Sequence, residues 1–326
     1  MIDVSVIIVS YNTRELLRRC LESLRRCSGA AVETVVVDNF STDRSAQMTA
    51  VDFPEVKLIP NRENAGFARA NNQGIRATGG RYVFCLNPDT EVAPDAIAAL
   101  VGCLDERGEE VAVAAPRLLE PDGSVQRSLR RFPTRAAVLY QHTLARYLFP
   151  PLRRAYGEYK MRDFDYGSDE PADAEQPMGA ALMIRRSALE EVGLFDEGFW
   201  MYFEEVDLLE RIHRAGYRIV YYPPARVVHH GGASAGPAKA KLYLEFHRSL
   251  LRYFRKRLRP GRAAAFAMVY KVLFVAKAAV EAVSRVVGAA ADAAARRAER
   301  SRRKLADARI RARFLTRDLV GFLLRM

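Results

Sequence analysis

The sequence lacks the short motifs that mark several common classes of nucleotide- and metal-binding protein. No GxGxxG pattern follows the first apolar run, and GxxxxGK[ST] occurs nowhere, so dinucleotide-dependent redox chemistry and P-loop chemistry both lose their usual support. Cysteine is scarce, and its four positions show neither CxxC nor Cys/His metal spacing: Cys20, Cys27, Cys85 and Cys103. We expect these to be reduced core thiols of a cytosolic protein.

A basic segment followed by a long apolar stretch is missing from the start of the chain, where a strand begins at once. We therefore expect no secretory signal. The first 240 residues carry a net charge of −4, whereas residues 241–326 hold 22 Lys and Arg against 6 Asp and Glu, a net charge of +16. This asymmetry argues against a nucleic-acid partner for the main part of the chain and predicts that the C-terminal segment meets an anionic surface.

The composition is that of a globular protein. Of the 326 residues, 49% are hydrophobic, enough to bury the core of one large domain or two ordinary ones. Apolar runs that are typical of strands alternate with helical patterns, and the runs lie at residues 3–10, 34–37, 56–60, 81–86 and 111–115. This alternation predicts an α/β fold with a mostly parallel sheet and helices on both faces.

Each of the first four predicted strands is followed by a polar turn, namely Tyr11-Asn12, Asp38-Asn39, Asn61 to Asn64, and Asn87 to Asp89. Because the carboxyl ends of parallel strands lie at one edge of a sheet, the four turns can converge on one crevice. Pro88 has no N–H to donate to a sheet ladder, so Asp89 comes directly after a strand end. It is a candidate ligand for a metal or for the phosphate side of a substrate. The alternative is a turn with no further role.

The second half of the chain gives less regular signals. Residues 127–176 are rich in Arg, Tyr and Pro and predict a long irregular excursion, of the kind that often forms a lid or an acceptor-binding loop. Residues 176–184 predict a strand with small side chains. A last strand, from residue 217 on, leads to His229 and a Gly-rich loop. An imidazole there can contact a metal or a phosphate, although a structural or surface role is the alternative.

Taken in order, seven motifs resemble those of glycosyltransferase family 2, and most of all its rhamnosyltransferase-like branch, which builds bacterial cell-surface polysaccharides. The resemblance covers about residues 1–250. Each motif is weak alone, and their number and order carry the resemblance. The motifs are residues 4–12 (VSVIIVSYN), 37–43 (VDNFSTD), 64–68 (NAGFA) with Asn71 and Asn72, 86–89 (LNPD), 193–197 (GLFDE), 201–208 (MYFEEVDL) and 229–234 (HHGGAS).

The resemblance implies a fold of the nucleotide-diphospho-sugar transferase (GT-A) type, an inverting mechanism, and a set of donor-binding residues. In this family the acid that matches Asp38 contacts the nucleotide base, and the turn that matches Tyr11 and Asn12 lines the same pocket. The motifs further assign to donor binding Asn64, Phe67 and Asn87.

The resemblance also implies a divalent cation, Mg²⁺ or Mn²⁺. Asp89 matches the last Asp of the family's DxD element, which binds the ion that bridges the donor diphosphate. Asn87 stands in place of the first Asp, a departure common in this branch. Because Asn87 is uncharged, the site looks metal-poor, and we expect further ligands from His229 or from the diphosphate. Such an ion would stabilise the charge of the leaving diphosphate.

The family's Glu-Asp-x-Asp motif falls on Glu204, Glu205 and Asp207, which makes Glu205 the expected general base at a position where the family usually has Asp. One base that deprotonates the acceptor hydroxyl, with one direct displacement, gives inversion and requires no carboxylate nucleophile. We expect like-charge repulsion from Glu204 and Asp207 to raise the proton affinity of Glu205, which suits a base.

The end of the chain predicts a basic amphipathic helical tail. Residues 263–287 are strongly apolar, and their polar residues fall in one sector of roughly 140° on a helical wheel: Lys271, Lys277, Glu281, Ser284 and Arg285. This pattern favours a helix in the interface of the cytoplasmic leaflet over a spanning one. An Arg-rich run follows residue 291, with apolar residues at helical intervals up to Phe322. The alternative is a helical hairpin packed on the main domain or on a second subunit.

We therefore predict a catalytic domain over residues 1–250 and a helical tail over residues 251–326. The predicted function is metal-dependent, inverting transfer of a sugar, for which the branch suggests rhamnose, from a dTDP- or UDP-linked donor. The predicted acceptor is a lipid-linked or cell-surface glycan at the inner face of the cell membrane, and a homo-oligomer is left open. One rival is a catalytically silent glycan-binding or scaffold protein of the same fold. The other is a nucleotidyltransferase, although residues 10–20 lack the Gly-rich, basic phosphate loop expected of one.

Overall fold

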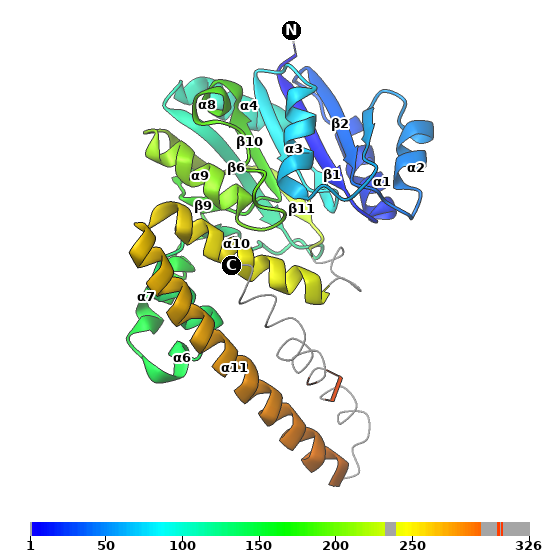
Figure 1. Cartoon of the computed structure of the whole chain (residues 1–326). Coiled ribbons are helices and arrows are strands. Elements are labelled where there is room, and N and C mark those ends of the chain that lie inside the picture. Colours follow the sequence, from blue (N-terminus) through cyan, green and yellow to red (C-terminus); the bar gives the residue numbers. More distant parts are fainter. Residues whose placement is uncertain (1, 232–238, 295–304, 307, 309–326) are drawn as a thin grey trace. The chain divides into compact units, whose positions relative to one another are not determined.

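The computed structural model describes residues 2–231, 239–294, 305, 306 and 308 (Figure 1). Most of the predicted Arg-rich run, including Leu315 and Phe322, and most of the Gly-rich loop after His229 lie outside these residues. The chain forms two compact units. The first comprises Met1–Phe132 and Met161–Ser249, and the second comprises Pro133–Lys160 and Leu250–Met326. The inserted segment 133–160 thus belongs with the C-terminal helices, and the predicted catalytic domain remains a proposal.

The first unit is built on a nine-stranded sheet with the order β3-β2-β1-β4-β10-β6-β11-β5, in which β8 also pairs with β11. Strands β3, β2, β1 and β4 are mutually parallel, and so are β6 and β11, whereas β10 is antiparallel to β4 and β6, and β5 is antiparallel to β11. The strands are β1 Val4–Ser10, β2 Val32–Asp38, β3 Lys57–Pro60, β4 Tyr82–Leu86, β5 Thr90–Val92, β6 Val111–Leu119, β8 Ala172–Asp173, β10 Ala181–Arg185 and β11 Arg218–His229. The predicted α/β fold is confirmed, with a mixed sheet.

Helices cover both faces of this sheet (Figure 1). One face is packed by α1 Arg14–Arg25, α2 Ser45–Asp52 and α4 Ala96–Arg107. The other face is packed by α3 Phe67–Arg76, α8 Arg186–Val192 and α9 Glu204–Arg214. Because both faces are covered, the central strands need apolar side chains on both sides, and this explains why they appear in the sequence as continuous apolar runs.

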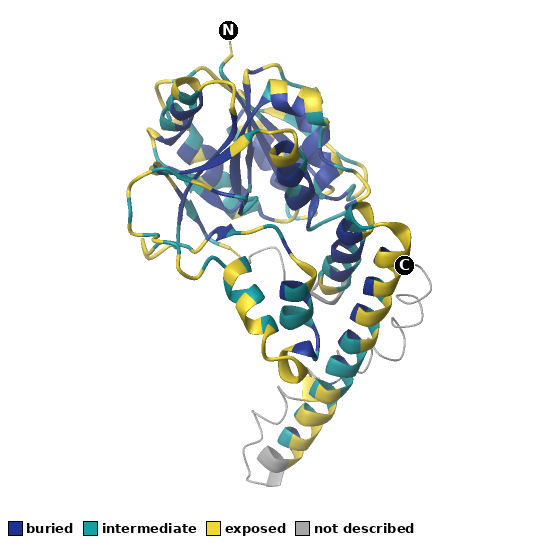
Figure 2. Cartoon of the chain, turned by 90° about the vertical axis from the view of Figure 1, so that its left-hand side faces the viewer, coloured by how far each residue is buried: buried dark blue, intermediate teal, exposed yellow. Residues whose placement is uncertain are grey.

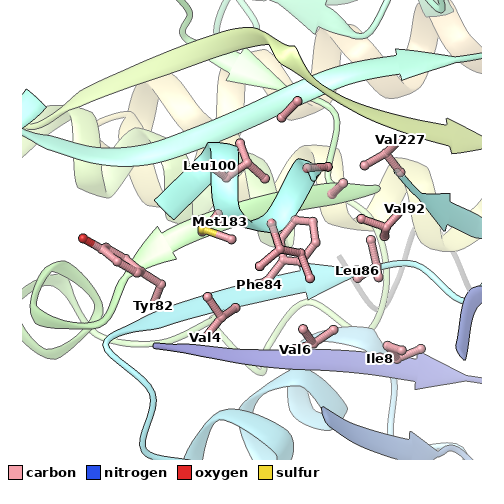
Figure 3. Close-up of a cluster of buried hydrophobic side chains, with 14 of the residues drawn as sticks. Val4, Val6, Ile8, Tyr82, Phe84, Leu86, Val92, Leu100, Met183 and Val227 are labelled. Atoms are coloured by element: carbon pink, nitrogen blue, oxygen red, sulfur yellow. The ribbon is translucent and has the colours of Figure 1, made fainter. Parts of the chain in front are cut away.

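The hydrophobic core follows the alternation of the strands. On β1, Val4, Val6 and Ile8 point to one face and pack with Phe84 of β4 and other residues (Figure 3), whereas Ile7 belongs to the cluster on the opposite face. All four cysteines are free, and three of them are buried: Cys20, Cys85 and Cys103. Burial raises the pKa of the Cys20 and Cys85 thiols to about 12, so they are inert core residues, as the sequence predicts.

Two helices begin without a hydrogen bond to their own N-cap side chain. Thr13 precedes α1, but its hydroxyl makes no capping hydrogen bond and lies 3.1 Å from the Ser10 hydroxyl. The first backbone N–H of α1, from Arg14, donates instead to Asp43 at 2.8 Å. Helix α2 begins at Ser45, and the Ser45 N–H donates to the Asp43 carboxylate at 3.0 Å. Asp43 therefore supports the starts of both helices.

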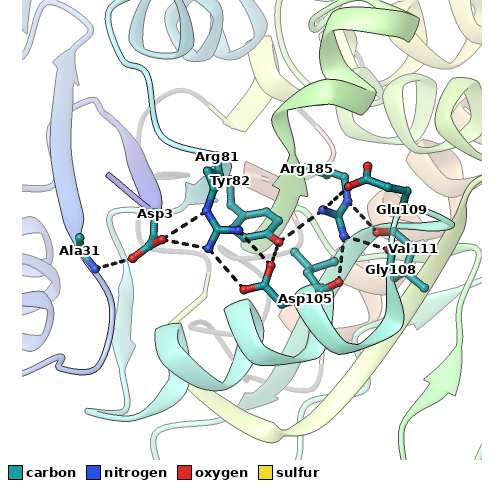
Figure 4. Close-up of polar contacts among 10 residues, drawn as sticks. Asp3, Ala31, Arg81, Tyr82, Asp105, Gly108, Glu109, Val111 and Arg185 are labelled. Atoms are coloured by element: carbon teal, nitrogen blue, oxygen red, sulfur yellow. Dashed lines mark hydrogen bonds and ion pairs between the residues drawn. The ribbon is translucent and has the colours of Figure 1, made fainter. Parts of the chain in front are cut away.

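Two arginines form ion pairs and hydrogen bonds at the edge of the sheet where β1 and β4 begin (Figure 4). Arg81 forms ion pairs with Asp3 at 2.9 Å and with Asp105 of α4 at 3.0 Å. The buried guanidinium of Arg185, at the end of β10, donates to the carbonyls of Leu104 at 2.8 Å and Gly108 at 2.9 Å. Because this edge is occupied by structural contacts, the carboxyl ends of β1, β2 and β4 remain for a site.

Residues 176–184, predicted to be one strand, form two elements instead. Strand β9 Gln176–Pro177 pairs with β7 Leu129–Arg130 in a separate two-stranded sheet, and the chain then turns before β10. In that turn the Met178 N–H donates to the carbonyl of Ser128 at 2.9 Å, and the carbonyl of Ala180 accepts from the Asn87 N–H at 2.8 Å. The break therefore places residues 178–180 against the turn that carries Asp89.

The second unit is helical. The prediction of an irregular excursion over 127–176 is wrong for its central part, which forms α5 Arg135–His142, α6 Ala145–Leu148 and α7 Leu152–Tyr159. Helix α10 Lys239–Arg257 leads into α11 Pro260–Ala294, and Phe254 and Phe266 pack with ring centroids 4.6 Å apart. Buried and exposed bands alternate along α11 (Figure 2), with Phe266, Tyr270 and Phe274 on its buried side.

The loop before α9 is held against the start of α3. The Phe67 N–H donates to the carbonyl of Trp200 at 2.7 Å, and the Trp200 indole N–H donates to the carbonyl of Asn64 at 3.3 Å. Gly66 makes this approach possible, because its φ is +85° and a Cβ atom there would lie 2.5 Å from the Trp200 carbonyl oxygen. Asn72 of α3 adds a reciprocal pair of hydrogen bonds with the backbone of Phe195, at 2.9 and 3.0 Å.

We expect Gly66→Ala to displace the Trp200 loop and to destabilise the protein by about 1–3 kcal/mol, because it combines a forbidden backbone conformation with a steric clash. Trp200 is the sole tryptophan, so its fluorescence reports the displacement directly. Gly108→Ala is the matched control, because Gly108 has a similar backbone (φ +70°) but nothing within 4 Å of its missing Cβ. If both variants lose the same stability with unchanged emission, the contact with Trp200 is unimportant.

Candidate active site

A cavity opens at the carboxyl ends of β1, β2 and β4, where the sequence predicts a crevice. Its walls come from three strand-end turns, the start of α3, the loop before α9 and the start of α10. The lining residues are Val9, Tyr11, Asn39, Asn64, Gly66, Phe67, Asn87, Pro88, Asp89, Trp200, Met201 and Leu242. Of the residues predicted to bind the donor or the metal, those in this lining are Tyr11, Asn64, Phe67, Asn87 and Asp89.

Asn12 and Asp38 lie beside this cavity without lining it. The Asn12 side-chain carbonyl accepts from the Thr42 N–H at 2.7 Å, and the Asn12 N–H donates to the Ser41 hydroxyl at 3.0 Å, so Asn12 joins the turns after β1 and β2. Asp38 is 3% exposed. Its Oδ2 accepts from the Ser41 N–H at 3.0 Å, whereas its buried Oδ1 has no hydrogen-bond partner among the described residues. Such an orphaned acceptor can receive an N–H group from a ligand.

Asn39 shapes the wall between these turns and α3. Its side-chain oxygen accepts from the Ala65 N–H at 2.9 Å and from the Asn61 amide at 3.1 Å, and its own NH₂ group donates to the Asn64 oxygen at 3.1 Å. Sequence reasoning assigned no role to Asn39, although it sits in the same strand-end turn as Asp38. Because the amide is used on both its donor and acceptor sides, Asn39 fixes the loop that carries Asn64.

The fold brings Asp89 and His229 together from positions 140 residues apart. Strand β11 lies between β6 and β5, and His229 pairs with Thr90 across the sheet. The His229 Nε2 is 3.5 Å from the Asp89 Oδ1, and both side chains are largely buried. The backbone adds a hydrogen bond of 2.9 Å from the His230 N–H to the Asp89 carbonyl. An imidazole and a carboxylate at this distance can share a divalent cation.

Asp89 and His229 would supply only two protein ligands to a metal ion. Among the residues that the structure describes, no group of three or more His, Cys, Asp or Glu side chains could hold a metal ion. The donor set of Asp89 and His229 fits Mg²⁺ or Mn²⁺ only if the substrate or water supplies the remaining ligands, as is common for Mg²⁺ bound with phosphates. The metal-poor site therefore stays a prediction, with Asp89 and His229 as its candidate protein ligands.

Glu204 and Glu205 begin helix α9 directly after two non-glycine residues with left-handed backbones, Tyr202 (φ 68°) and Phe203 (φ 67°). The Oε2 atoms of both glutamates are shielded from solvent and have no hydrogen-bond partner in the described part of the chain. Burial raises the pKa of Glu205, and burial together with the charge of Glu205 raises the pKa of Glu204 well above its usual value. Carboxyl groups with raised pKa values are typical of acid–base sites.

Asp207 has a different role from its two neighbours. Its buried carboxylate forms an ion pair with Arg211 at 2.9 Å. Arg211 also donates to the carbonyls of Val192 at 2.6 Å and Leu194 at 2.7 Å, at the start of the loop before α9. The expected repulsion from Asp207 therefore does not account for the raised pKa of Glu205, which burial explains instead. Asp207 stabilises the loop through Arg211.

Glu205 does not line the cavity, but the segment 179–180 connects it with the Asp89 turn. A Cβ atom on Gly179 would lie 3.0 Å from the Glu205 Cγ, so Glu205 packs directly on this glycine. The next residue, Ala180, accepts the hydrogen bond from Asn87. The sequence predicts a close approach at these small residues, and the approaching group is the side chain of Glu205. The side chain of Glu205 and the backbone of Asn87, two residues before Asp89, thus contact neighbouring residues of one short segment.

Trp200, Met201 and Leu242 line the cavity and were not predicted as site residues. Met201 is the first residue of the motif 201–208 and Trp200 precedes it. An aromatic residue before the acidic helix is the one signal that could have indicated them. Leu242 carries no local signal, because its place in the lining depends on how the start of α10, which belongs to the first unit, packs within that unit. An apolar wall of this kind is usual for ligand pockets, which combine few polar groups with apolar surface.

Comparison with known proteins identifies the family. The chain matches the family model described as glycosyl transferase family 2 over residues 5–193. It is 32% identical over 263 residues to an N-acetylglucosaminyl-diphospho-decaprenol L-rhamnosyltransferase of Mycobacterium tuberculosis, an alignment that covers 75% of this chain and 81% of that protein. It is 28% identical over 221 residues to the low-salt glycan biosynthesis hexosyltransferase Agl10 of Haloferax volcanii, covering 67% of this chain and 64% of that protein.

Solved structures support the fold. GalNAc-T7 with UDP, GalNAc and Mn²⁺ superposes with a TM-score of 0.56 at 18% identity, covering 83% of this chain and 54% of that one. TarS 1-349 of S. aureus in complex with UDP-GlcNAc gives a TM-score of 0.50 at 16% identity, covering 82% of this chain and 71% of that one. These likenesses show the fold alone, which is of the GT-A type. From the family match and the rhamnosyltransferase relative, the chain belongs to glycosyl transferase family 2 and is a glycosyltransferase.

Proposed function

We propose that this glycosyltransferase is metal-dependent and inverting, and that it transfers a sugar from a nucleotide-diphosphate donor to a lipid-linked glycan. The observation that carries the proposal is the arrangement around the Asp89 turn. His229 stands 3.5 Å from Asp89 on one side, and Gly179 and Ala180 connect the turn with Glu205 on the other. This arrangement supports the proposal that the Asp89 turn serves the leaving diphosphate and Glu205 the acceptor.

The donor is proposed to bind in the cavity with its base toward Asp38. The Oδ1 of Asp38, which has no hydrogen-bond partner among the described residues, is suited to an N–H of a pyrimidine base. The exposed Tyr11, in the turn after β1, lines the cavity. Neighbouring structures carry UDP or UDP-GlcNAc. The rhamnosyltransferase relative suggests rhamnose, and hence a dTDP- or UDP-linked rhamnose donor, together with an acceptor that carries a lipid diphosphate.

Asp89 and His229 are proposed to hold Mg²⁺ or Mn²⁺, which when bound neutralises charge that develops on the leaving diphosphate. Asn87, which precedes Asp89 in the same turn, is uncharged and can donate its amide hydrogens to a phosphate oxygen. Trp200 and Met201 exclude water from the opposite wall of the cavity.

Glu205 is proposed as the general base that takes the proton of the acceptor hydroxyl. Its Oε2 makes no hydrogen bond within the described chain, so no structural contact occupies this acceptor. A raised pKa strengthens it as a base while it is still ionised. Glu204 shares the same buried environment and is proposed to stay protonated when Glu205 is charged, because two adjacent buried carboxylates resist ionising together.

We expect Glu205→Gln and Asp89→Ala to fail in different steps. Glu205→Gln keeps the size of the side chain and removes the base, so kcat should fall by roughly 10²- to 10⁴-fold with donor binding nearly unchanged. Asp89→Ala should weaken metal-dependent donor binding by at least about 10-fold. Calorimetry with the donor, with and without Mn²⁺, and product assays separate the two effects. Full turnover by Glu205→Gln refutes the base assignment, and donor binding without turnover in the wild type indicates a silent binding protein.

The pH dependence of transfer should follow Glu205. Because the pKa of Glu205 is raised by burial, the base is ionised only above that raised pKa, and kcat should fall as the pH falls through it. Glu205→Asp is the informative variant, since a shorter carboxylate alters burial while keeping a base. We expect the acid limb of the pH profile of kcat to shift in this variant, and its affinity for the donor to stay unchanged. A kcat that stays flat below the usual titration range of glutamate contradicts the assignment.

The second unit is proposed to contact a membrane through one face of α11. Seven large apolar residues of α11 are exposed, and at 100° per residue they fall in one sector of roughly 120°: Met268, Val269, Val272, Val280, Val283, Val286 and Val287. This stripe extends for about 29 Å along the helix. The polar residues predicted to face water lie on the opposite side, with buried Phe266 and Tyr270. There Lys277 and Glu281 form an ion pair at 3.8 Å.

A bilayer interface fits this stripe because exposed arginine and lysine lie near its start. Arg255, Lys256 and Arg259 precede α11, and Arg262 lies in its first turn, so acyl chains and anionic head groups can be contacted together. The segment Pro260–Ala290 is also long and apolar enough to cross a membrane, which is weak evidence by itself. Its four charged residues from Lys271 to Arg285 favour an interfacial position. Such a position, at the cytoplasmic face, suits a lipid-linked acceptor.

We expect the double variant Val272→Asp with Val283→Asp to lose vesicle binding, because two charges in the exposed stripe oppose insertion. Co-sedimentation with vesicles of phosphatidylglycerol and phosphatidylcholine should show at least about 10-fold weaker partitioning. Val51→Asp is the matched control, since Val51 is 70% exposed on α2 of the first unit, and it should bind as the wild type does. If the double variant binds vesicles as the wild type does, the membrane proposal is wrong. If the wild type is a dimer in analytical ultracentrifugation and the double variant is a monomer, the exposed stripe binds a second copy of the chain instead.

A further inference from the structure

A hairpin after β6 contacts the side of His229 that faces away from Asp89. The turn at residues 120–124 is closed by a hydrogen bond of 2.8 Å from the Glu120 N–H to the Ser124 carbonyl. Gln126 follows, with its N–H on the carbonyl of Leu118 at 2.9 Å. Because β6 and β11 are parallel neighbours, with Leu119 paired to Val228, this hairpin reaches the end of β11. The Gln126 Oε1 lies 2.8 Å from the His229 Nδ1.

The orientation of the Gln126 amide follows from Glu120. The Gln126 Nε2 lies 2.8 Å from the Glu120 Oε1, and an ionised carboxylate only accepts hydrogen bonds, so the NH₂ group of Gln126 must face Glu120. Its carbonyl oxygen then faces His229. A carbonyl oxygen also only accepts, and the Nδ1 of His229 must therefore carry the hydrogen.

These hydrogen bonds determine whether the Nε2 atom of His229, which faces Asp89, carries a hydrogen or a lone pair. With the hydrogen on Nδ1, the neutral imidazole has a lone pair on Nε2, which lies 3.5 Å from the Asp89 Oδ1. Two acceptors then face each other across a gap too long for a strong hydrogen bond. Both side chains are largely buried, so water relieves this contact little. A cation between the two atoms would turn a repulsive pair into two ligands.

We propose that Gln126, oriented by Glu120, is a positioning residue that fixes the tautomer of His229, so that Nε2 and the Asp89 carboxylate are presented together to a divalent cation. The inference rests on the proposed metal site. Gln126 touches neither the cavity nor the reacting atoms, and it acts through His229. Metal-binding histidines commonly donate their second ring N–H to such a partner.

The test measures the tautomer without metal and the metal affinity separately. Long-range ¹H–¹⁵N spectra of the metal-free protein distinguish the two ring nitrogens of His229. We expect the Nδ1–H form in the wild type. Glu120→Gln should give a mixture, because a second amide allows Gln126 to flip. Ser124→Ala is the control within the same turn: it removes the Ser124 hydroxyl bond to Asp122 but leaves Gln126 in place, and it should keep the wild-type spectrum.

Mn²⁺ binding, followed by the electron paramagnetic resonance of free Mn²⁺, gives the second readout. Gln126→Leu should weaken Mn²⁺ binding by about 10-fold or more, and Glu120→Gln by less. A wild-type His229 with its hydrogen on Nε2, or an unchanged tautomer in Glu120→Gln, overturns the inference. The Nδ1–H form together with no Mn²⁺ binding by the wild type overturns the proposed metal site and still supports the hydrogen-bond order assigned to Gln126.

Discussion

The position of β11 between β6 and β5 is the constraint on which the site depends. It brings the last residue of β11 beside the first residue of β5, and hence His229 beside Asp89. It also places the hairpin after β6 on the other side of His229. Three segments that are distant in sequence therefore meet through backbone pairing alone. Because backbone hydrogen bonds of a central strand are buried and cooperative, this geometry is insensitive to small changes in the surrounding side chains.

Three neighbouring buried acids at the start of α9 differ in whether a basic side chain neutralises them. Asp207 is neutralised by Arg211, whose guanidinium also stabilises the loop that ends at Trp200. Glu204 and Glu205 have shielded oxygens without such partners, which destabilises their ionised forms. Unpaired buried acids are unfavourable for folding, and the left-handed residues before them add strain. Both features agree with the acid–base role proposed for this pair.

Helix α11 shows that a sequence pattern defines the two faces of a helix but not what each face contacts. Its polar residues do form one sector, as the wheel predicts, but that sector lies on the side with buried Phe266, Tyr270 and Phe274, and the apolar sector is exposed. Periodicity establishes that a helix has two faces. It does not establish which face meets protein, because packing against the rest of the second unit decides this.

The sequence alone determined the alternation of strands and helices, the carboxyl-end turns that carry Tyr11, Asn64 and Asp89, and the family, because apolar periodicity and turn chemistry are local properties. Tertiary structure alone decided that β10 runs antiparallel, that Gly179 accommodates Glu205, and that Gln126 contacts His229. These facts depend on strand order and on contacts between residues that are 26 to 103 positions apart. No local pattern encodes such contacts, since their energy arises only when the chain is folded.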